Sequence, residues 1–262
     1  MIGTIASSSM SSSARDVRFG SYTFYTPINY VDYNGCNTTL TIQNSGDECT
    51  SIEIWYKEQD NCLRAQIDSV PQLAPGESVT IKPPPTLGPG WIGSAWIRAS
   101  QPLGIVADIR CTNNGVTTLS TYTGIPAEYY DTMNHIFQPG SLFAYGPLTY
   151  REEYGWDTTV QVQNMSSITN AKVKVYFFDN SGDIIRTMVD WVCPRGSQTF
   201  TLAAVNNLPG RYVGSVRVES QDWWSPGDPP VDGATDFLFM LMTAALHGAG
   251  IGSAAAARWA TN

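Results

Sequence analysis

The chain carries the same pattern twice. Residues 35–44 read GCNTTLTIQN, and residues 155–164 read GWDTTVQVQN. Further matches follow in the same order along both stretches. Such self-similarity indicates duplicated modules, and it constrains the architecture more than any other feature of the sequence. The matching segments are Ile54–Tyr56 with Val175–Phe177, Pro75–Gly76 with Pro194–Gly196, Trp91–Ala95 with Tyr212–Val216, and Ser100–Gln101 with Ser220–Gln221.

Short runs of alternating apolar and polar residues fill the first copy. In residues 38–44, Leu40 and Ile42 fall on one face, and Thr39, Thr41 and Gln43 fall on the other. This alternation is typical of a half-buried strand, and Pro, Gly, Asn and Asp mark turns between the runs. The spacing predicts about seven strands in an antiparallel sandwich. Strands are expected at 38–44, 51–57, 78–82, 92–99, 104–111 and 116–122.

The 262 residues leave room for two domains, each with its own core. We predict a Ser-rich N-terminal arm at 1–16, a first β-sandwich at 17–127, a connector at 128–139 and a second β-sandwich at 140–262. The connector is short and its composition is not that of a flexible linker, so the two domains should hold a restricted angle. Composition favours a helix at 253–260, whereas the repeat favours a strand, which we expect there.

Charge and hydropathy limit the classes of partner. The formal net charge is -8 and no run is basic, so a nucleic-acid partner is not expected. No stretch is long and apolar enough to predict a membrane span. The N-terminal residues lack the basic and apolar regions of an intact secretory signal.

Motifs for catalysis and cofactor binding are missing. The two histidines, His135 and His247, stand in no nucleophile motif, and no phosphate- or dinucleotide-binding loop occurs. Residues 179–183 (DNSGD) look like half of a calcium loop, but they also suit a hairpin turn, which is the expectation adopted here. We predict that the chain is not an enzyme and that it binds no cofactor and no metal.

The five cysteines form no CxxC pair, which argues against a zinc site. Cys36 precedes one expected strand and Cys62 follows the next, so these two would meet if the strands pair antiparallel. Cys49 lies at the opposite end, where Cys111 would also arrive. Two disulfides in the first domain, with Cys193 left over, would fit an extracellular protein. Buried free thiols are the alternative for each cysteine.

The second copy departs from the first in two places. An insertion at 222–232 places Trp223 and Trp224 on a Pro- and Gly-rich loop, as a platform for a sugar or partner or as a lid over the domain's own core. Residues 237–242 (FLFMLM) are apolar on both faces, so both faces of this expected strand should be covered. The second face either contacts another subunit or is covered by the Trp insertion or the connector.

The order NTTLTIQN (37–44), LAPGESV (73–79), GSA (93–95) and SQPL (100–103) resembles the tandem Ig-like β-sandwich repeats of bacterial secreted and cell-surface proteins. The resemblance covers most of the first copy, and the second is more divergent. It implies an all-β chain of two tandem Ig-like antiparallel β-sandwich domains. It also implies an extracellular or cell-surface, non-enzymatic stalk, coat, filament or adhesive module, with no catalytic residues to transfer.

Three functional hypotheses follow. In the first, the chain is an extracellular structural protein that assembles with copies of itself into a filament, tube or surface layer, with the N-terminal arm adding to a neighbour's sheet edge. In the alternative, it is a carbohydrate-binding or adhesive module that presents Trp223 and Trp224 to surface glycans. A third reading, an accessory domain of a larger extracellular enzyme, predicts further sequence beyond residue 262. The candidate assembly contacts are Ile2, Ile5, Phe237, Phe239 and Leu241.

Overall fold

The computed structural model describes residues 22–62, 65–113, 115–126, 129–131, 136–138, 143–153, 156–166, 170–202, 210–221 and 238–246. The described part consists almost entirely of strands, and none of its helices is long and apolar enough to cross a membrane. The predicted all-β fold class is therefore confirmed. The earlier elements are β1 (Tyr22–Val31), β2 (Cys36–Asn44), β3 (Thr50–Glu58), β4 (Ala65–Leu73), β5 (Ser78–Ile81), the 3-10 helix η1 (Pro85–Leu87), β6 (Trp91–Ala99), β7 (Leu103–Asn113), β8 (Val116–Thr123) and β9 (Ile125–Pro126). The later elements are β10 (Tyr129–Asp131), β11 (Ile136–Gln138), β12 (Phe143–Arg151), β13 (Trp156–Asn164), β14 (Ala171–Phe178), β15 (Ile184–Val192), β16 (Ser197–Thr201), β17 (Tyr212–Ser220) and β18 (Leu238–Leu246).

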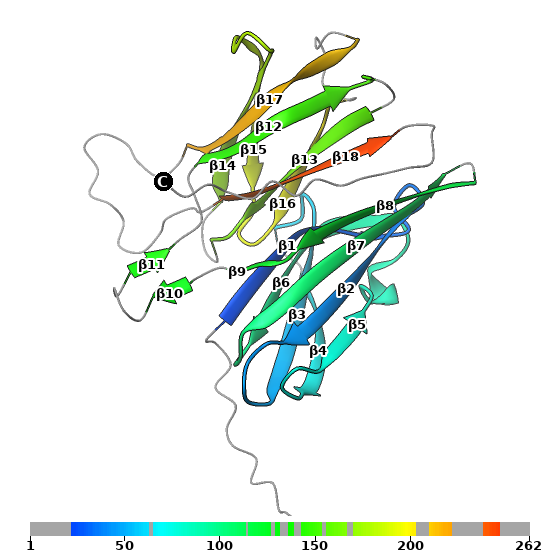
Figure 1. Cartoon of the computed structure of the whole chain (residues 1–262), viewed down its shortest axis with the longest axis vertical. Helices are drawn as coiled ribbons and strands as arrows, with labels where there is room; N and C mark the ends of the chain where they lie inside the picture. The colour runs from blue at the N-terminus through cyan, green and yellow to red at the C-terminus, as the bar shows by residue number, and fades with distance from the viewer. Residues whose placement is uncertain are drawn as a thin grey trace, which may run out of the picture.

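The strands form two antiparallel sandwiches joined by the small β10–β11 hairpin (Figure 1). In the first sandwich, one sheet has the order β4-β3-β6-β1-β9 and the other has the order β5-β2-β7-β8. In the second, the order β12-β17-β14-β15 faces β16-β13-β18. When β12 is matched with β1, β13 with β2 and so on to β18 with β7, the matched strands have the same neighbours in both copies. The duplication seen in the sequence is therefore also a duplication of topology.

Each sandwich encloses its own core, built from the alternating positions of its strands. Leu40 and Ile42 of β2 are fully buried, as the alternation predicts, while Gln43 is exposed. Side chains from both sheets meet in each core, and burying a residue of this size contributes about 1.5–3 kcal/mol. The first core includes Ile28, Leu40, Ile42, Ile52, Ile54, Ile97 and Ala107, and the second includes Val160, Val162, Val173, Val175, Phe177 and Val218.

The asparagine that ends the repeated motif has the same structural role in both copies. Asn44 is fully buried; its Nδ2 donates to the Leu73 carbonyl at 3.0 Å and its Oδ1 accepts the Gly46 N–H at 3.0 Å. Asn164 is equally buried and donates to the Val192 carbonyl at 3.0 Å. Each side chain thus satisfies backbone groups where the chain leaves one sheet for the other, which explains why this residue type recurs.

The repeated Gly-Ser pair marks a close approach of backbone to an aromatic ring. A Cβ built on Gly93 would clash with the Lys57 carbonyl oxygen and the Trp91 ring. A Cβ on Gly214 would clash with the Phe178 carbonyl oxygen and the Tyr212 ring. Only glycine fits where the strand crosses its neighbour at this distance, so both copies keep it.

The disulfides differ from the pairing suggested by the sequence. Cys36 bonds to Cys111, Cys62 bonds to Cys193, and Cys49 is a free, exposed thiol. The earlier expectation assumed that the strands after Cys36 and before Cys62 pair with each other. Instead β2 and β3 lie in different sheets, and β2 pairs with β7, which sets Cys36 directly opposite Cys111. Cys193 is not left over, because it joins the second sandwich to the first.

Candidate functional site

The two sandwiches pack against each other through a set of polar contacts, here called the inter-sandwich interface. The sheet β16-β13-β18 of the second sandwich lies beside β1, β6 and β8 of the first (Figure 1). The Cys62–Cys193 disulfide joins the β3–β4 turn to the β15–β16 turn, with 5.3 Å between the two Cα atoms. The two modules are therefore tied by a covalent bond as well as by contacts.

Two glutamines on the outer face of β13 show what the inter-sandwich interface covers. Gln161 and Gln163 are 1% and 0% exposed, whereas Gln43, the counterpart of Gln163 in the first copy, lies in solvent. Gln161 Nε2 donates to the Pro27 carbonyl at 3.1 Å, and Gln163 Nε2 donates to the Ala95 carbonyl at 3.2 Å. These amides fix the register between the sandwiches, because each reaches a backbone oxygen of β1 or β6.

The β15–β16 turn is the second anchor of the inter-sandwich interface. Lys57 Nζ donates to the Pro194 carbonyl at 2.6 Å, and Ser94 Oγ donates to the Arg195 carbonyl at 3.0 Å. Burial lowers the pKa of the Lys57 amine, and the nearby charge of Arg195 lowers it further. The Arg195 guanidinium lies over the Trp96 ring in a cation–π contact. The Trp96 ring also stacks on Trp55, with 5.5 Å between the ring centroids.

The apolar late strand adjoins this interface. β18 pairs with β13 along its whole length, with Phe239 opposite Gln163 and Leu241 opposite Gln161. Its backbone also lies beside β1 and β8 of the first sandwich. Another subunit, the Trp insertion or the connector was expected to cover this strand; the structure places the first sandwich next to it.

The outer face of the sheet β12-β17-β14-β15 is rich in aromatic and cationic side chains. The Arg217 guanidinium lies 4.4 Å from the ring centroid of Tyr176, and Lys174 Nζ lies 4.8 Å from the same ring. Arg217 also lies 3.8 Å from Glu219 in an ion pair. Tyr145 on β12 is 58% exposed and Trp191 on β15 is 56% exposed. The outer face of the other sheet, β16-β13-β18, contacts the first sandwich. The outer face of β12-β17-β14-β15 makes no such contact among the described residues.

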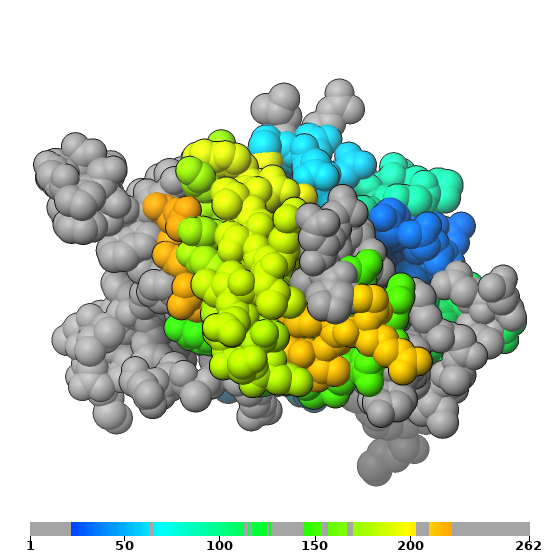
Figure 2. Space-filling view, turned by 90° about the horizontal axis from the view of Figure 1, so that it is seen from above, coloured from blue at the N-terminus to red at the C-terminus, as the bar shows by residue number. Residues whose placement is uncertain are grey.

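The corresponding edge strands β15 and β4 of the two copies differ in how they meet solvent. β15 exposes Ile184, Val189 and Trp191, all of them large and apolar. Its counterpart β4 exposes one such residue, Ile67, and carries Pro71 at a register shift, where the chain cannot donate a backbone hydrogen bond. Figure 2 shows the β14–β15 region, in yellow-green to yellow, as a broad surface of the molecule. An exposed apolar edge favours addition of another strand, and of these two edges β15 is the less protected.

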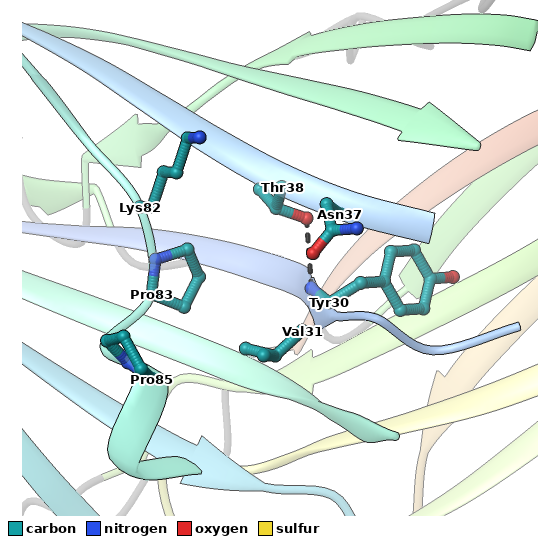
Figure 3. Close-up of a pocket in the computed structure, with 7 residues that line it drawn as sticks. All are labelled: Tyr30, Val31, Asn37, Thr38, Lys82, Pro83 and Pro85. Atoms are coloured by element: carbon teal, nitrogen blue, oxygen red, sulfur yellow. Dashed lines mark hydrogen bonds between the residues drawn. The ribbon is translucent and has the colours of Figure 1, made fainter. Parts of the chain in front are cut away.

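A small groove lies in the first sandwich between β2 and the proline-rich segment after β5. Its volume is about 240 Å³, and its lining includes Tyr30, Thr38, Lys82, Pro83 and Pro85 (Figure 3). The Thr38 hydroxyl accepts the Tyr30 N–H at 2.9 Å, and burial raises the pKa of the Tyr30 hydroxyl. Ligand pockets usually measure about 300–1,000 Å³ and hold several convergent polar groups. This groove is smaller and offers one ammonium group, so we assign it no role.

The described residues hold no group of three or more His, Cys, Asp or Glu side chains that could bind a metal ion. The DNSGD segment is a turn, as expected: Asp179 Oδ1 accepts the Ser181 N–H at 2.8 Å and the Asp183 N–H at 3.0 Å. These backbone hydrogen bonds lower the pKa of the Asp179 carboxyl, and the bond from Asp183 has the largest effect. Its oxygens therefore shape the hairpin.

Several residues singled out in the sequence lie outside the described residues: Trp223, Trp224, Ile2, Ile5, Phe237 and the segment 253–260. Phe239 and Leu241 lie on β18, as described above. Arg195, Tyr145 and Trp191 were not predicted from the sequence. Around Val189 and Trp191 the sequence reads MVDWV, with one polar residue, so no alternation indicated an exposed strand face there, and nothing local to Arg195 indicates its contact with Trp96.

No protein-family model matches the chain, and no curated protein matches it. Among solved structures, the crystal structure of Thermotoga maritima 1070 is similar at 19% sequence identity with a TM-score of 0.36. The match covers 40% of this chain and 93% of that one. A likeness at this level carries no argument about fold or function.

Proposed function

We propose that the chain is an extracellular structural protein, related to Ig-like surface repeats, that assembles with copies of itself. The observation that carries this proposal is the β15 edge, where Ile184, Val189 and Trp191 are 54%, 51% and 56% exposed. An exposed strand of this kind is a template for pairing with another chain. Assembly would bury this surface between identical subunits, and the N-terminal arm (1–16) would supply a second contact by strand addition.

The disulfides support the extracellular part of the proposal. Cys36–Cys111 staples two neighbouring strands and Cys62–Cys193 staples the two sandwiches. Structural disulfides of this kind persist in oxidising environments and are rare in the cytosol. The internally anchored inter-sandwich interface also suits a structural unit, because a subunit with a fixed shape can repeat regularly.

The test is electron microscopy and light scattering of the purified full chain over a wide concentration range. We expect regular filaments, tubes or sheets, and an average mass that rises with concentration. A chain that remains monomeric at high concentration would rule out self-assembly. Deletion of residues 1–16 tests the arm separately: polymers that form equally well without it would show that the arm is not a contact.

A carbohydrate-binding or adhesive role is the second candidate, and the exposed rings of Tyr145 and Trp191 favour it. Aromatic rings on an open sheet face pack against sugar rings, and neighbouring cations attract acidic sugars. A glycan array probed with the full chain tests this role. Binding that falls on replacement of Trp191 by Ala would place the site on the sheet face. Binding lost only on replacement of Trp223 and Trp224 would place it on the insertion loop, and a blank array would dismiss the role.

A further inference from the structure

The free edge strand β15 carries two opposite charges placed symmetrically about its central residue. β15 spans Ile184–Val192, so Met188 is its central residue, with Arg186 two positions before the centre and Asp190 two positions after it. The Arg186 Nε is buried and has no hydrogen-bond partner. The Asp190 carboxylate accepts the Gln198 amide at 2.9 Å from Oδ2 and the Trp191 N–H at 2.8 Å from Oδ1.

We propose that two copies of the chain join through β15, antiparallel, about a two-fold axis at Met188. In that register, Arg186 of each copy lies opposite Asp190 of the other, because the two residues are equally far from the centre. Opposite charges in directly opposed positions stabilise a strand pair, whereas like charges destabilise it. The strand is therefore complementary to itself, which a two-fold contact requires.

The backbone and the outer face fit the same arrangement. Because the Trp191 N–H is held by a side chain and not by β14, the alternate residues Thr187 and Val189 also direct their N–H groups to the free edge. In the proposed register, Thr187 of one copy pairs with Val189 of the other. The sheets of both copies would then form one continuous sheet, and the exposed surfaces of Val189 and Trp191 would lie against the partner.

β4, the strand of the first sandwich that corresponds to β15, does not offer this contact. If two copies of β4 paired antiparallel about their central residue, Ser69, Asp68 of each copy would lie opposite Val70 of the other. Pro71, near the register shift, also has no backbone N–H to donate. A copy-to-copy contact at β4 would therefore leave a carboxylate facing a valine. Of these two corresponding edges, β15 alone sets opposite charges against each other when it is paired with itself about its central residue, and this charge complementarity is why the occupant is a second copy rather than an unrelated strand.

The test is a charge-exchange series measured by sedimentation equilibrium on the full chain. Arg186→Asp should weaken self-association at β15 at least about tenfold, because two carboxylates then face each other at both symmetric sites. Arg186→Asp combined with Asp190→Arg should bring the association back to within about threefold of the original, since the opposition is restored. A double variant as weak as the single variant, or a single variant without effect, would overturn the proposal.

Proline variants keep the test decisive if a charge variant folds poorly. Val189→Pro removes an N–H that points to the free edge and should abolish association through β15, whereas Ser69→Pro on β4 is the matched control and should leave it unchanged. Far-ultraviolet circular dichroism and urea unfolding confirm that each variant folds. Equal effects of both prolines would contradict the assignment to β15. Association lost on deletion of residues 1–16 but insensitive to Val189→Pro would assign the contact to the arm instead.

This inference rests on the proposed self-assembly, but the two can fail separately. A two-fold contact closes on itself and yields a dimer, so a polymer needs a second, different contact. A dimer that responds to the charge exchange without forming polymers would support the β15 contact and refute the polymer. A polymer that ignores the charge exchange would do the reverse.

Discussion

The guanidinium of Arg195 lies over the indole ring of Trp96, 5.1 Å from the ring centroid, and the two residues belong to different sandwiches. Trp96 is 8% exposed and lies on the outer face of its sheet, so the ring is covered by the other module rather than by its own core. The backbone of Arg195 has positive φ and its carbonyl accepts hydrogen bonds from Ser94 and Gln163. One turn residue thus holds the inter-sandwich interface through both its side chain and its backbone.

Replacing Arg195 by Ala should weaken the contact between the sandwiches by about 1 kcal/mol, the usual size of a partly desolvated cation–π contact. The carbonyl of residue 195 would still accept its two hydrogen bonds, so the interface should loosen without opening. Urea unfolding gives the loss, and Arg110→Ala, on an exposed site in β7, is the control. A loss of the same size in the control would show that the effect is one of general charge.

The disulfide pairing predicts a specific thiol count. Under denaturing, non-reducing conditions the chain should titrate as one thiol, that of Cys49, and after reduction as five. A single proteolytic cut between Cys111 and Cys193 should leave two fragments that separate on a gel only after reduction, because Cys62–Cys193 spans the cut. Fragments that separate without reductant would show that this bond is not formed. Cys62→Ser serves as the positive control for separation.

Gly93→Ala and Gly214→Ala should each cost about 3 kcal/mol of unfolding free energy, because a Cβ has no room beside the neighbouring carbonyl oxygen and ring. Gly104→Ala in β7 has open space around its Cβ and should change stability by less than about 0.5 kcal/mol. Chemical denaturation of the three variants measures the difference. Similar losses at Gly93 and Gly214, which belong to different copies, would also show that the repeat keeps glycine for one reason.

Lys57 should make stability depend on alkaline pH. Its pKa is lowered in the folded chain, chiefly by burial, from the ordinary value of 10.5. At a pH between the folded pKa and 10.5, the unfolded state binds a proton that the native state does not, so the free energy of unfolding rises with pH in this window. Below the folded pKa and above 10.5 this dependence vanishes.

The measurement compares the original chain with Lys57→Gln by urea unfolding from pH 7 to 10.5, both carrying Cys49→Ser to prevent thiol exchange. We expect the stability of the original chain to increase relative to that of the variant as the pH approaches 10.5. A constant difference across this range would mean that the amine titrates normally and that the inter-sandwich interface does not exclude solvent from it.

The architecture within each sandwich could be predicted from the sequence, because its signals are local. The alternation of Leu40 and Ile42 predicted a half-buried strand, and the recurrence of Asn44 as Asn164 reflects one backbone requirement met twice. The disulfides could not be predicted in this way. Their pairing depends on which strands share a sheet, and β2 and β3, although consecutive, do not.

The contact surfaces could not be predicted from the sequence either, because they too depend on which distant segments the fold brings together. Gln161 looks like a solvent-facing strand residue, and only the placement of the other sandwich buries it. Residues that act across the inter-sandwich interface, such as Arg195 and Trp96, lie far apart in sequence and carry no shared pattern. The self-complementary spacing of Arg186 and Asp190 was visible in the sequence, but its meaning depends on β15 being an edge.

The bond between Cys62 and Cys193 also determines how the chain would respond to tension. Pulled from its two ends, a chain with this cross-link carries the load through the sulfur atoms and bypasses the 131 positions that separate the two cysteines. At about 3.6 Å per extended residue, roughly 470 Å of contour length stays hidden until the bond is reduced. For a subunit working in a surface layer or filament, stretching would then be limited by redox chemistry rather than by the strength of the β-sheets.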